Sequence, residues 1–460
     1  MKKEIIDRMV EIVGQDYVVD DLSQMKSYLY DETEFKIRPT ADEDCIVVKP
    51  EKAEQISEIV KYANEIKVAI VARGGGTGLC GAAIPTQPSI IVSLERLNKT
   101  VEFDDKNLMI TVESGMTLEG LLEALSPYDK LFFPVHPGDE GAQIGGMVVE
   151  NAGGVRAVKH GIMRNHVKGV EIVLPTGELV NFGGKLIKNN MGYDLLHMII
   201  GSEGTLGIVT KATLKLYPKN QHIGTLVVSF DSKEEAADVV PKILQEGITP
   251  LAIEYMEKET ALESAKHLGL TYPAKQGTVD LMFILDETCE DDLYEKSGRI
   301  VEMCEENGAV DSLIAETTSE QKTLLNIRSN VYTAYKENIA DALDIAVPPS
   351  KVPEMINELN RIAKKYNTTA PSVGHIADGN VHNFVMLENG KLPEYLEDIR
   401  NEMYDAAIKL GGTVTAEHGT GKTRKKHMSM QYTEREMQIM ENIKKSFDPN
   451  NILNPHTIVD

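Results

Sequence analysis

Hydrophobic and polar positions along residues 44–218 follow a pattern typical of strands separated by helices. A short apolar run at 45–48 predicts a strand, and apolar residues recur at helical spacing over 52–66. The run 68–72 predicts a second, buried strand. Glycine-rich and strand-rich sequence then continues to 208–216, before a proline. The first half of the chain therefore predicts a mixed α and β domain.

Beyond Lys219 the pattern predicts a second sheet with helical crossovers. Elements in this order favour an α+β sheet covered on one face, and residues 354–460 return to helices around two polar motifs. The expected strands are 225–230, 251–256 and 279–285, and the expected helices are 233–246 and 292–307.

The length of 460 residues is too great for one compact core, so at least two domains are expected. We predict an α+β chain with a polar helical extension at 1–38, a first domain at 39–219 and a second domain at 220–460.

Composition excludes several classes of protein. A formal net charge of −23 would repel a nucleic-acid backbone, so nucleic-acid binding is not expected. The N-terminus lacks the apolar core of a signal peptide, and no apolar run is long enough to span a bilayer, which favours a cytoplasmic protein. The four cysteines form no C-x-x-C pair, so neither a disulfide framework nor an iron–sulfur cluster is supported.

A glycine-rich loop follows the strand expected at 68–72. Residues 76–81 match G-x-G-x-x-G, but a Rossmann site needs a helix directly afterwards, and Pro85 and Pro88 leave no room for one. The loop instead offers unhindered backbone N–H groups that suit a pyrophosphate. We expect this anion site to comprise Arg73, Gly74, Gly75, Gly76, Thr77 and Gly78.

Three further segments, 136–146, 151–154 and 201–208, would also let backbone approach a flat ligand. In this order and spacing the segments resemble the PCMH-type FAD-binding domain of the vanillyl-alcohol oxidase and p-cresol methylhydroxylase superfamily. The branch with glycolate oxidase catalytic subunits, D-lactate dehydrogenases and D-2-hydroxyglutarate dehydrogenases is the most similar. The resemblance also implies an α+β FAD-linked oxidase C-terminal domain.

The resemblance implies bound FAD. Covalent attachment in this superfamily commonly uses a histidine in the pyrophosphate loop, and 73–81 contains none, so FAD is expected to be non-covalent. Beyond that loop, the expected cofactor-binding residues are Pro137, Gly138, Gly145, Gly146, Asn151, Gly153, Gly154, Glu203, Gly204 and Ile208.

Two dense motifs, 374–382 and 415–422, hold three of the eleven histidines. Asp378-Gly379 is a strong signal for a two-residue hairpin turn, which would place His375 directly opposite His382. Such partners lie about 4.5–5.5 Å apart at Cβ, close enough to share a divalent metal, with Glu417 as a third ligand. The alternative is two histidines that cap a hairpin by hydrogen bonds.

The family resemblance assigns roles to these residues. It implies a divalent metal, Zn, Fe or Mn, at His375, His382 and Glu417, and it implies that His418 faces the flavin as base. A histidine suits removal of a hydroxyl proton because its pKa lies near working pH. Arg328 matches the substrate-binding arginine, with Asn380 as a second contact, although Arg328 as a plain surface helix residue is the alternative.

These features predict FAD-dependent oxidation of a small 2-hydroxy acid to the 2-oxo acid, with hydride passing to flavin N5. Hydroxyglutarate-type enzymes carry a lysine where this chain has Ala342, which favours D-lactate over a dicarboxylate. Glycolate and D-2-hydroxyglutarate are the alternative substrates. An NAD-dependent Rossmann dehydrogenase and a non-catalytic flavin-binding protein are the alternatives of other classes.

The chain itself has no cluster or haem motif to pass electrons onward, so a partner protein is expected. The resemblance offers an electron-transferring flavoprotein, as in electron-confurcating lactate dehydrogenases, or a separate iron–sulfur subunit, as in glycolate oxidase complexes. We favour the flavoprotein.

Overall fold

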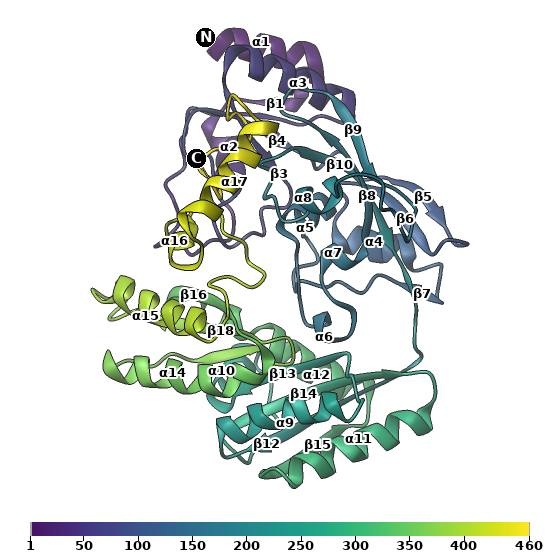
Figure 1. Ribbon diagram of the computed structural model, residues 1–460, viewed down its shortest axis with the longest axis vertical. Coiled ribbons are helices and arrows are strands. Elements are labelled where there is room, and N and C mark those ends of the chain that lie inside the picture. Colours follow the sequence, from purple (N-terminus) through teal and green to yellow (C-terminus); the bar gives the residue numbers. More distant parts are fainter. Residues whose placement is uncertain (1, 460) are drawn as a thin grey trace. The chain divides into compact units, whose positions relative to one another are not determined.

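The computed structural model describes residues 2–459 and divides into two compact units (Figure 1). Unit 1 comprises Met1–Gly153, Ile162–Lys219 and Glu417–Asp460, and unit 2 comprises Gly154–Gly161 and Asn220–Ala416. Both units mix helices with sheets, which confirms the predicted α+β class. Relative to the predicted boundaries, the chain beyond Ala416 packs in unit 1 and an eight-residue segment of the first half packs in unit 2.

The N-terminal part of unit 1 contains a four-stranded sheet of order β1-β2-β4-β3. Strands β2, β4 and β3 are parallel, and β1 pairs with β2 in antiparallel fashion. The apolar stripe of α3 packs on one face of this sheet together with α1, as the helical spacing predicted. The elements are α1 Lys2–Val13, β1 Val18–Val19, α2 Leu22–Leu29, β2 Ile46–Val48, α3 Ala53–Ile66, β3 Ala69–Arg73 and β4 Ser89–Ser93.

No helix lies between β3 and β4 in this fully described stretch of the chain. The glycine-rich sequence forms an irregular loop, as the prolines predicted. This excludes the Rossmann arrangement, in which a helix begins directly after the glycine fingerprint.

A second sheet in unit 1 has the order β5-β6-β10-β8-β9 and is antiparallel throughout. Helices α4 and α5 contribute Leu118, Leu121, Ile144 and Met147 to the core that it forms. The elements of this part are β5 Thr100–Asp104, β6 Met109–Glu113, α4 Leu118–Leu125, β7 Leu131–Phe132, α5 Ile144–Glu150, α7 Met163–His166, β8 Val167–Val173, β9 Leu179–Gly183, α8 Leu195–Ile199, β10 Ile208–Lys215 and β11 Tyr217–Pro218.

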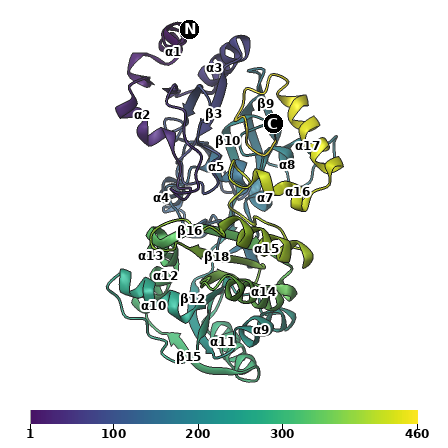
Figure 2. The same ribbon diagram turned by 90° about the vertical axis from the view of Figure 1, so that its left-hand side faces the viewer.

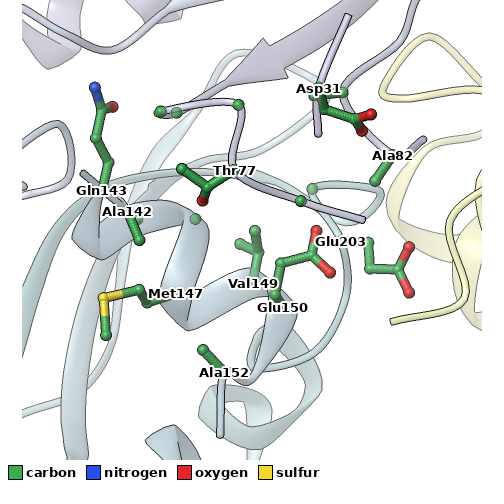
Figure 3. Close-up of a pocket in the computed structure, with 18 of the residues that line it drawn as sticks. Asp31, Thr77, Ala82, Ala142, Gln143, Met147, Val149, Glu150, Ala152 and Glu203 are labelled. Atoms are coloured by element: carbon green, nitrogen blue, oxygen red, sulfur yellow. The ribbon is translucent and has the colours of Figure 1, made fainter. Parts of the chain in front are cut away.

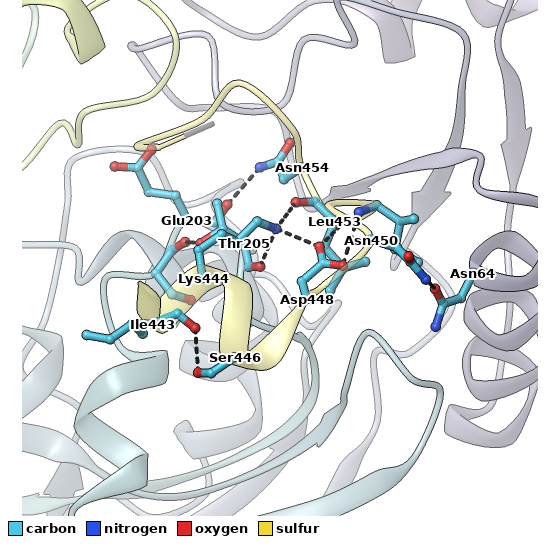
Figure 4. Close-up of polar contacts among 12 residues, drawn as sticks. Asn64, Glu203, Thr205, Ile443, Lys444, Ser446, Asp448, Asn450, Leu453 and Asn454 are labelled. Atoms are coloured by element: carbon cyan, nitrogen blue, oxygen red, sulfur yellow. Dashed lines mark hydrogen bonds and ion pairs between the residues drawn. The ribbon is translucent and has the colours of Figure 1, made fainter. Parts of the chain in front are cut away.

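The C-terminal tail of unit 1 contains α16 (Met428–Gln431) and α17 (Glu434–Phe447), and after them Leu453 forms a parallel bridge with Ile70 of β3. Buried Lys444 donates to Asp448 Oδ2 at 2.6 Å and to the carbonyl oxygens of Thr205 and Leu453 at 2.9 and 2.8 Å (Figure 4). Asn454 N then donates to Ile70 O at 2.7 Å. These bonds explain why the tail belongs to unit 1.

Unit 2 is built on a seven-stranded antiparallel sheet of order β15-β12-β14-β13-β17-β18-β16. The prediction that only one face is covered was wrong, because all nine residues of β14 are buried. Figure 2 shows α10, α12 and α13 on one side of the sheet and α9, α14 and α15 on the other. The strands are β12 His222–Phe230, β13 Ala252–Glu257, β14 Val279–Glu287, β15 Ala309–Ala315, β16 Ile339–Ala346, β17 Ser372–His375 and β18 Asn380–Met386.

The helices of unit 2 include the short α6, which comes from the segment Gly154–Gly161. Lys159 Nζ in this helix pairs with Asp286 Oδ1 at 2.5 Å, and Val155 packs on Leu251 and Ile284. None of the helices in residues 2–459 is both long and apolar enough to cross a membrane. The helices are α6 Ala157–His160, α9 Lys233–Gln245, α10 Lys258–His267, α11 Glu290–Glu305, α12 Thr318–Ser329, α13 Val331–Tyr335, α14 Val352–Lys365 and α15 Leu396–Lys409.

Candidate functional site

Unit 1 contains a cavity of about 1230 Å³, part of it open to solvent, beneath the glycine-rich loop after β3 (Figure 3). Helix α5, the segment before β10 and the C-terminal tail supply the other walls. Predicted residues on its wall are Gly74, Gly75, Gly76, Thr77, Gly78, Pro137, Gly145, Gly146, Gly153, Glu203, Gly204 and Ile208, together with Glu417 and His418.

At Gly75 the loop at 74–78 approaches neighbouring backbone so closely that a side chain is excluded. A Cβ on Gly75 would lie 2.5 Å from Gly141 O, and Gly76 has a φ of +73°, which favours glycine. Backbone N–H groups held in this way suit the phosphates of a dinucleotide. The glycine wall of the cavity thus fits the pyrophosphate of FAD.

Arg73 lies under this loop rather than on the cavity wall. Its Nη2 donates to Ser27 O at 2.8 Å, and burial lowers the pKa of its guanidinium. Its charge acts on the cavity through the loop. Among the other predicted residues, Gly138, Asn151 and Gly154 are also absent from the described wall. Asn151 instead ends α5 with a φ of +54°.

The acidic residues on the wall include Asp31, Glu150 and Glu203, and of these three only Glu203 was predicted. Burial raises the pKa of each, and for Glu150 the carboxylates of Glu203 and Asp31 add to the effect. Lys422, nearby in the chain after His418, has its pKa lowered by burial to about 8. Its Nζ donates to Ala82 O at 2.9 Å and to Thr457 Oγ1 at 2.8 Å.

The segment that carries His418 is held by several bonds within unit 1. Cys80 Sγ donates to Gly419 O at 2.9 Å. Glu203 accepts from the N–H groups of Thr420 and Gly421, both at 2.7 Å. Cys80 and Glu203, which bind this segment, belong to loops that line the cavity. The position of His418 on the wall therefore depends on those loops.

In unit 2 the two histidines of the first motif lie on one face of the β17–β18 hairpin. The prediction that they are directly opposite was wrong: His375 pairs with Asn380, and His382 pairs with Val373. The turn contains four residues, 376–379, so His382 is two positions further along its strand and still on the same face. The ring centroids are 5.4 Å apart.

Each of these histidines has a carboxylate partner. His375 Nδ1 is 2.7 Å from Glu254 Oε1, and His382 Nδ1 is 3.6 Å from Asp344 Oδ1. The contact of His375 is a hydrogen bond of the kind that orients imidazoles that ligate metals, whereas the contact of His382 is a longer ion-pair distance. Two imidazoles on one face, each backed by a carboxylate, form a donor set suited to a divalent cation.

Arg328, in the last turn of α12, is partly buried rather than a plain surface residue, with 12% of its side chain exposed. Its Nη2 is 2.7 Å from Glu254 Oε2, and Glu254 is only 1% exposed. Burial by itself would raise the pKa of Glu254, but the charges of Arg328 and His375 outweigh it and hold that pKa below its usual range. Arg328 Nε is buried and finds no hydrogen-bond acceptor within residues 2–459.

Asn380 holds Asp344 in place. Its Nδ2 donates to Asp344 Oδ1 at 2.9 Å and to Ile345 O at 3.0 Å, so only its Oδ1 is left for a substrate. Asp344 Oδ2 accepts from Thr415 Oγ1 at 3.0 Å and from Ala416 N at 2.8 Å. The strand carrying Asp344 therefore fixes the chain directly before Glu417.

Sequence reasoning missed Glu254, Asp344, Asp31 and Glu150. A signal existed for Glu254 and Asp344, because each is an acidic residue within an apolar strand. Such a residue must be paired when it is buried. Asp31 precedes the predicted first domain, and nothing in the local pattern indicates that it faces a cavity.

Comparison with protein families gives two matches. Residues 45–183 match an FAD binding domain, and residues 219–458 match the C-terminal domain of FAD linked oxidases.

Named relatives cover almost the whole chain. A D-lactate dehydrogenase from Archaeoglobus fulgidus is 36% identical over 96% of this chain and 99% of its own length. A glycolate oxidase subunit GlcD from Bacillus subtilis is 33% identical over 98% of this chain and 96% of its own.

Solved structures show the same fold. A p-cresol methylhydroxylase with substrate bound has a TM-score of 0.79 at 18% identity, covering 100% of this chain and 97% of its own. An alkyldihydroxyacetonephosphate synthase has a TM-score of 0.72 at 18% identity, with coverage of 98% and 84%.

Proposed function

The chain belongs to the FAD-linked oxidases, and we propose that it oxidises a small 2-hydroxy acid, D-lactate in preference to glycolate, to the 2-oxo acid. The observation that carries this proposal is the cluster of partly buried Arg328 with the neighbouring imidazoles of His375 and His382. A cation for the carboxylate beside donors for a metal matches the two oxygen groups of a 2-hydroxy acid.

Arg328 binds the substrate carboxylate through Nε–H, which lacks a protein acceptor within residues 2–459. Glu254 holds the guanidinium in place through Nη2 and, through its other oxygen, orients His375. Glu254 thus links Arg328, the proposed partner of the substrate carboxylate, to His375, a proposed metal ligand. We propose Asn380 as a positioning residue for Asp344 and, through Oδ1, as a further substrate contact.

His375, His382 and Glu417 are the proposed ligands of a divalent Zn, Fe or Mn ion. The bond from His375 Nδ1 to Glu254 leaves Nε2 as the ring nitrogen that would ligate a metal. Glu417 follows Ala416, whose N–H is bound to Asp344 Oδ2. A cation held there would act as a Lewis acid on the substrate hydroxyl and lower its pKa.

His418 is the proposed base. It lies on the wall of the cavity that fits FAD, and the bonds of Gly419, Thr420 and Gly421 fix the backbone after it. A neutral imidazole in this position removes the hydroxyl proton as the α-carbon is oxidised. Bound FAD supplies the electron acceptor for the hydride.

The surroundings of Ala342 support a short substrate. Ala342 belongs to an apolar cluster with Val331, Ile339, Val373 and Phe384. A second carboxylate placed against this cluster would be desolvated without compensation. A monocarboxylate such as lactate avoids that cost.

We propose that electrons leave the flavin for a separate protein, an electron-transferring flavoprotein in preference to an iron–sulfur subunit. The family relatives include both D-lactate dehydrogenases and a glycolate oxidase subunit, which supports the reaction class.

Anaerobic bleaching of the flavin tests the proposal. The FAD-bound protein is mixed with D-lactate, L-lactate, glycolate and D-2-hydroxyglutarate without oxygen, and flavin absorbance is followed. We expect D-lactate to bleach it fastest. A yellow protein that none of the four acids bleaches, although dithionite does, would overturn the assignment to 2-hydroxy acids.

A further inference from the structure

Glu150, the last residue of α5, faces the cavity in unit 1 without an evident structural task. Its Oε2 is shielded from solvent and has no hydrogen-bond partner within residues 2–459. Figure 3 shows its carboxyl group at the cavity near that of Glu203. A shielded carboxyl oxygen without a partner is costly when it is ionised, which favours the protonated form of this carboxyl group at the cavity wall.

Glu150 and Glu203 meet at the backbone that follows His418. A Cβ on Gly419 would lie 2.6 Å from Glu150 Oε2 and 3.2 Å from Glu203 Oε1. Two carboxyl groups so close together in a buried place do not both ionise, because their like charges repel. Repulsion between the two groups therefore favours a proton on one of them.

The hydrogen bonds decide which carboxyl group is neutral. Glu203 accepts from two backbone N–H groups, those of Thr420 and Gly421, and such bonds favour its ionised form. Glu150 Oε2 has no such donor. Burial and the charge of Glu203 accordingly raise the pKa of Glu150 well above its usual range. The charge of Lys422 lowers that pKa, but by less.

We propose that Glu150 presents a neutral carboxylic acid to the bound flavin and donates a hydrogen bond to it. The inference rests on the proposed function in one respect, namely that His418, and with it Gly419, lies at the flavin ring. A neutral donor favours the electron-rich reduced ring and strengthens FAD binding. An ionised Glu150 would have the opposite effect on the ring.

Two substitutions separate these cases. Glu150→Gln keeps the shape and an N–H donor and carries no charge, whereas Glu150→Leu removes the donor. Glu65→Gln, at an exposed glutamate in α3 of the same unit, is the control. The readouts are the dissociation constant of FAD and the midpoint potential of the flavin in reductive titrations without substrate.

We expect Glu150→Gln to bind FAD within a few-fold of the parent and to change the two-electron reduction equilibrium by less than tenfold, about 30 mV. Glu150→Leu should weaken FAD binding by on the order of tenfold, as expected for a lost buried hydrogen bond, and should lower the potential. The infrared C=O stretch of a protonated carboxylic acid should be present in the parent and absent from Glu150→Gln.

A rise in the midpoint potential of Glu150→Gln by more than about 30 mV would show that Glu150 is ionised and would overturn the proposal. Parent-like affinity and potential in Glu150→Leu would show that no hydrogen bond to flavin exists. If Glu150→Leu does not fold, Glu150→Gln and the infrared band still decide. Because no substrate is used, failure of hydroxy-acid oxidation would leave this result unaffected.

Discussion

Replacement of Lys444 by alanine should destabilise unit 1 and weaken its hold on FAD. Lys444 is 4% exposed, and its ammonium satisfies Asp448 and the carbonyl oxygens of Thr205 and Leu453. Removal of one partner from a buried ion pair costs about 3–5 kcal/mol, because the other charge is left uncompensated. The tail ordered by these bonds carries Asn454, which lines the cavity and donates to Glu203 O at 2.7 Å.

The lower end of that range, about 3 kcal/mol, applies here because other donors remain for Asp448. Its Oδ1 and Oδ2 accept from the N–H groups of Ile452 and Leu453 at 3.1 and 2.8 Å. For a unit of this size, about 3 kcal/mol corresponds to a fall in Tm of roughly 6–12 °C. The dissociation constant of FAD should rise by on the order of tenfold as the tail loosens.

Thermal unfolding and FAD titration of Lys444→Ala measure both effects, with exposed Lys445→Ala as the matched control. The double variant Lys444→Met with Asp448→Leu should recover much of the lost stability, since both buried charges are then removed. If Lys444→Ala unfolded at the same temperature as Lys445→Ala, the ion pair would have no part in holding the tail.

Three further predictions concern the chemistry. His382→Ala should lose most of the bound metal and keep FAD, whereas His418→Ala should keep both and reduce flavin on the order of 10²–10⁴-fold more slowly. Elemental analysis measures the metal, and stopped-flow absorbance measures flavin reduction. Full metal in His382→Ala would show that the roles of the two histidines are misassigned. Because Ala342 lies in an apolar cluster, kcat/KM for D-lactate should exceed that for D-2-hydroxyglutarate in steady-state assays, and the reverse order would refute the argument. Acid precipitation should release all flavin into the supernatant, since 73–81 contains no histidine; colour retained in the pellet would indicate a covalent link.

Local pattern predicted much of the fold correctly. The spacing over 52–66 identified α3, and Pro85 and Pro88 ruled out a helix after the glycine-rich loop. In both cases the information is local: apolar residues on one side of a helix need a surface to cover, and proline cannot continue a helix. The hairpin of the histidine motif was found for the same reason, but its register was not.

The register of that hairpin depends on contacts outside it. Gly379 O accepts from Val347 N at 3.1 Å, and a Cβ on Gly379 would collide with Val347 O. The turn that packs against the end of β16 contains four residues, whereas Asp378-Gly379 alone predicted a turn of two residues. Side-chain periodicity nevertheless placed His375 and His382 on one face, because a shift of two residues preserves the face.

By itself the sequence determined the alternation of elements, the glycine-rich loop without a following helix and the two histidine motifs, because each follows from neighbouring residues. Only the tertiary structure decided that the chain after Ala416 returns to unit 1, that Glu254 joins Arg328 to His375, and that Glu150 meets Glu203. These pairings connect residues far apart in the chain. The preference of a buried charge for a partner is present in the sequence, but the identity of the partner depends on which strands and loops pack together.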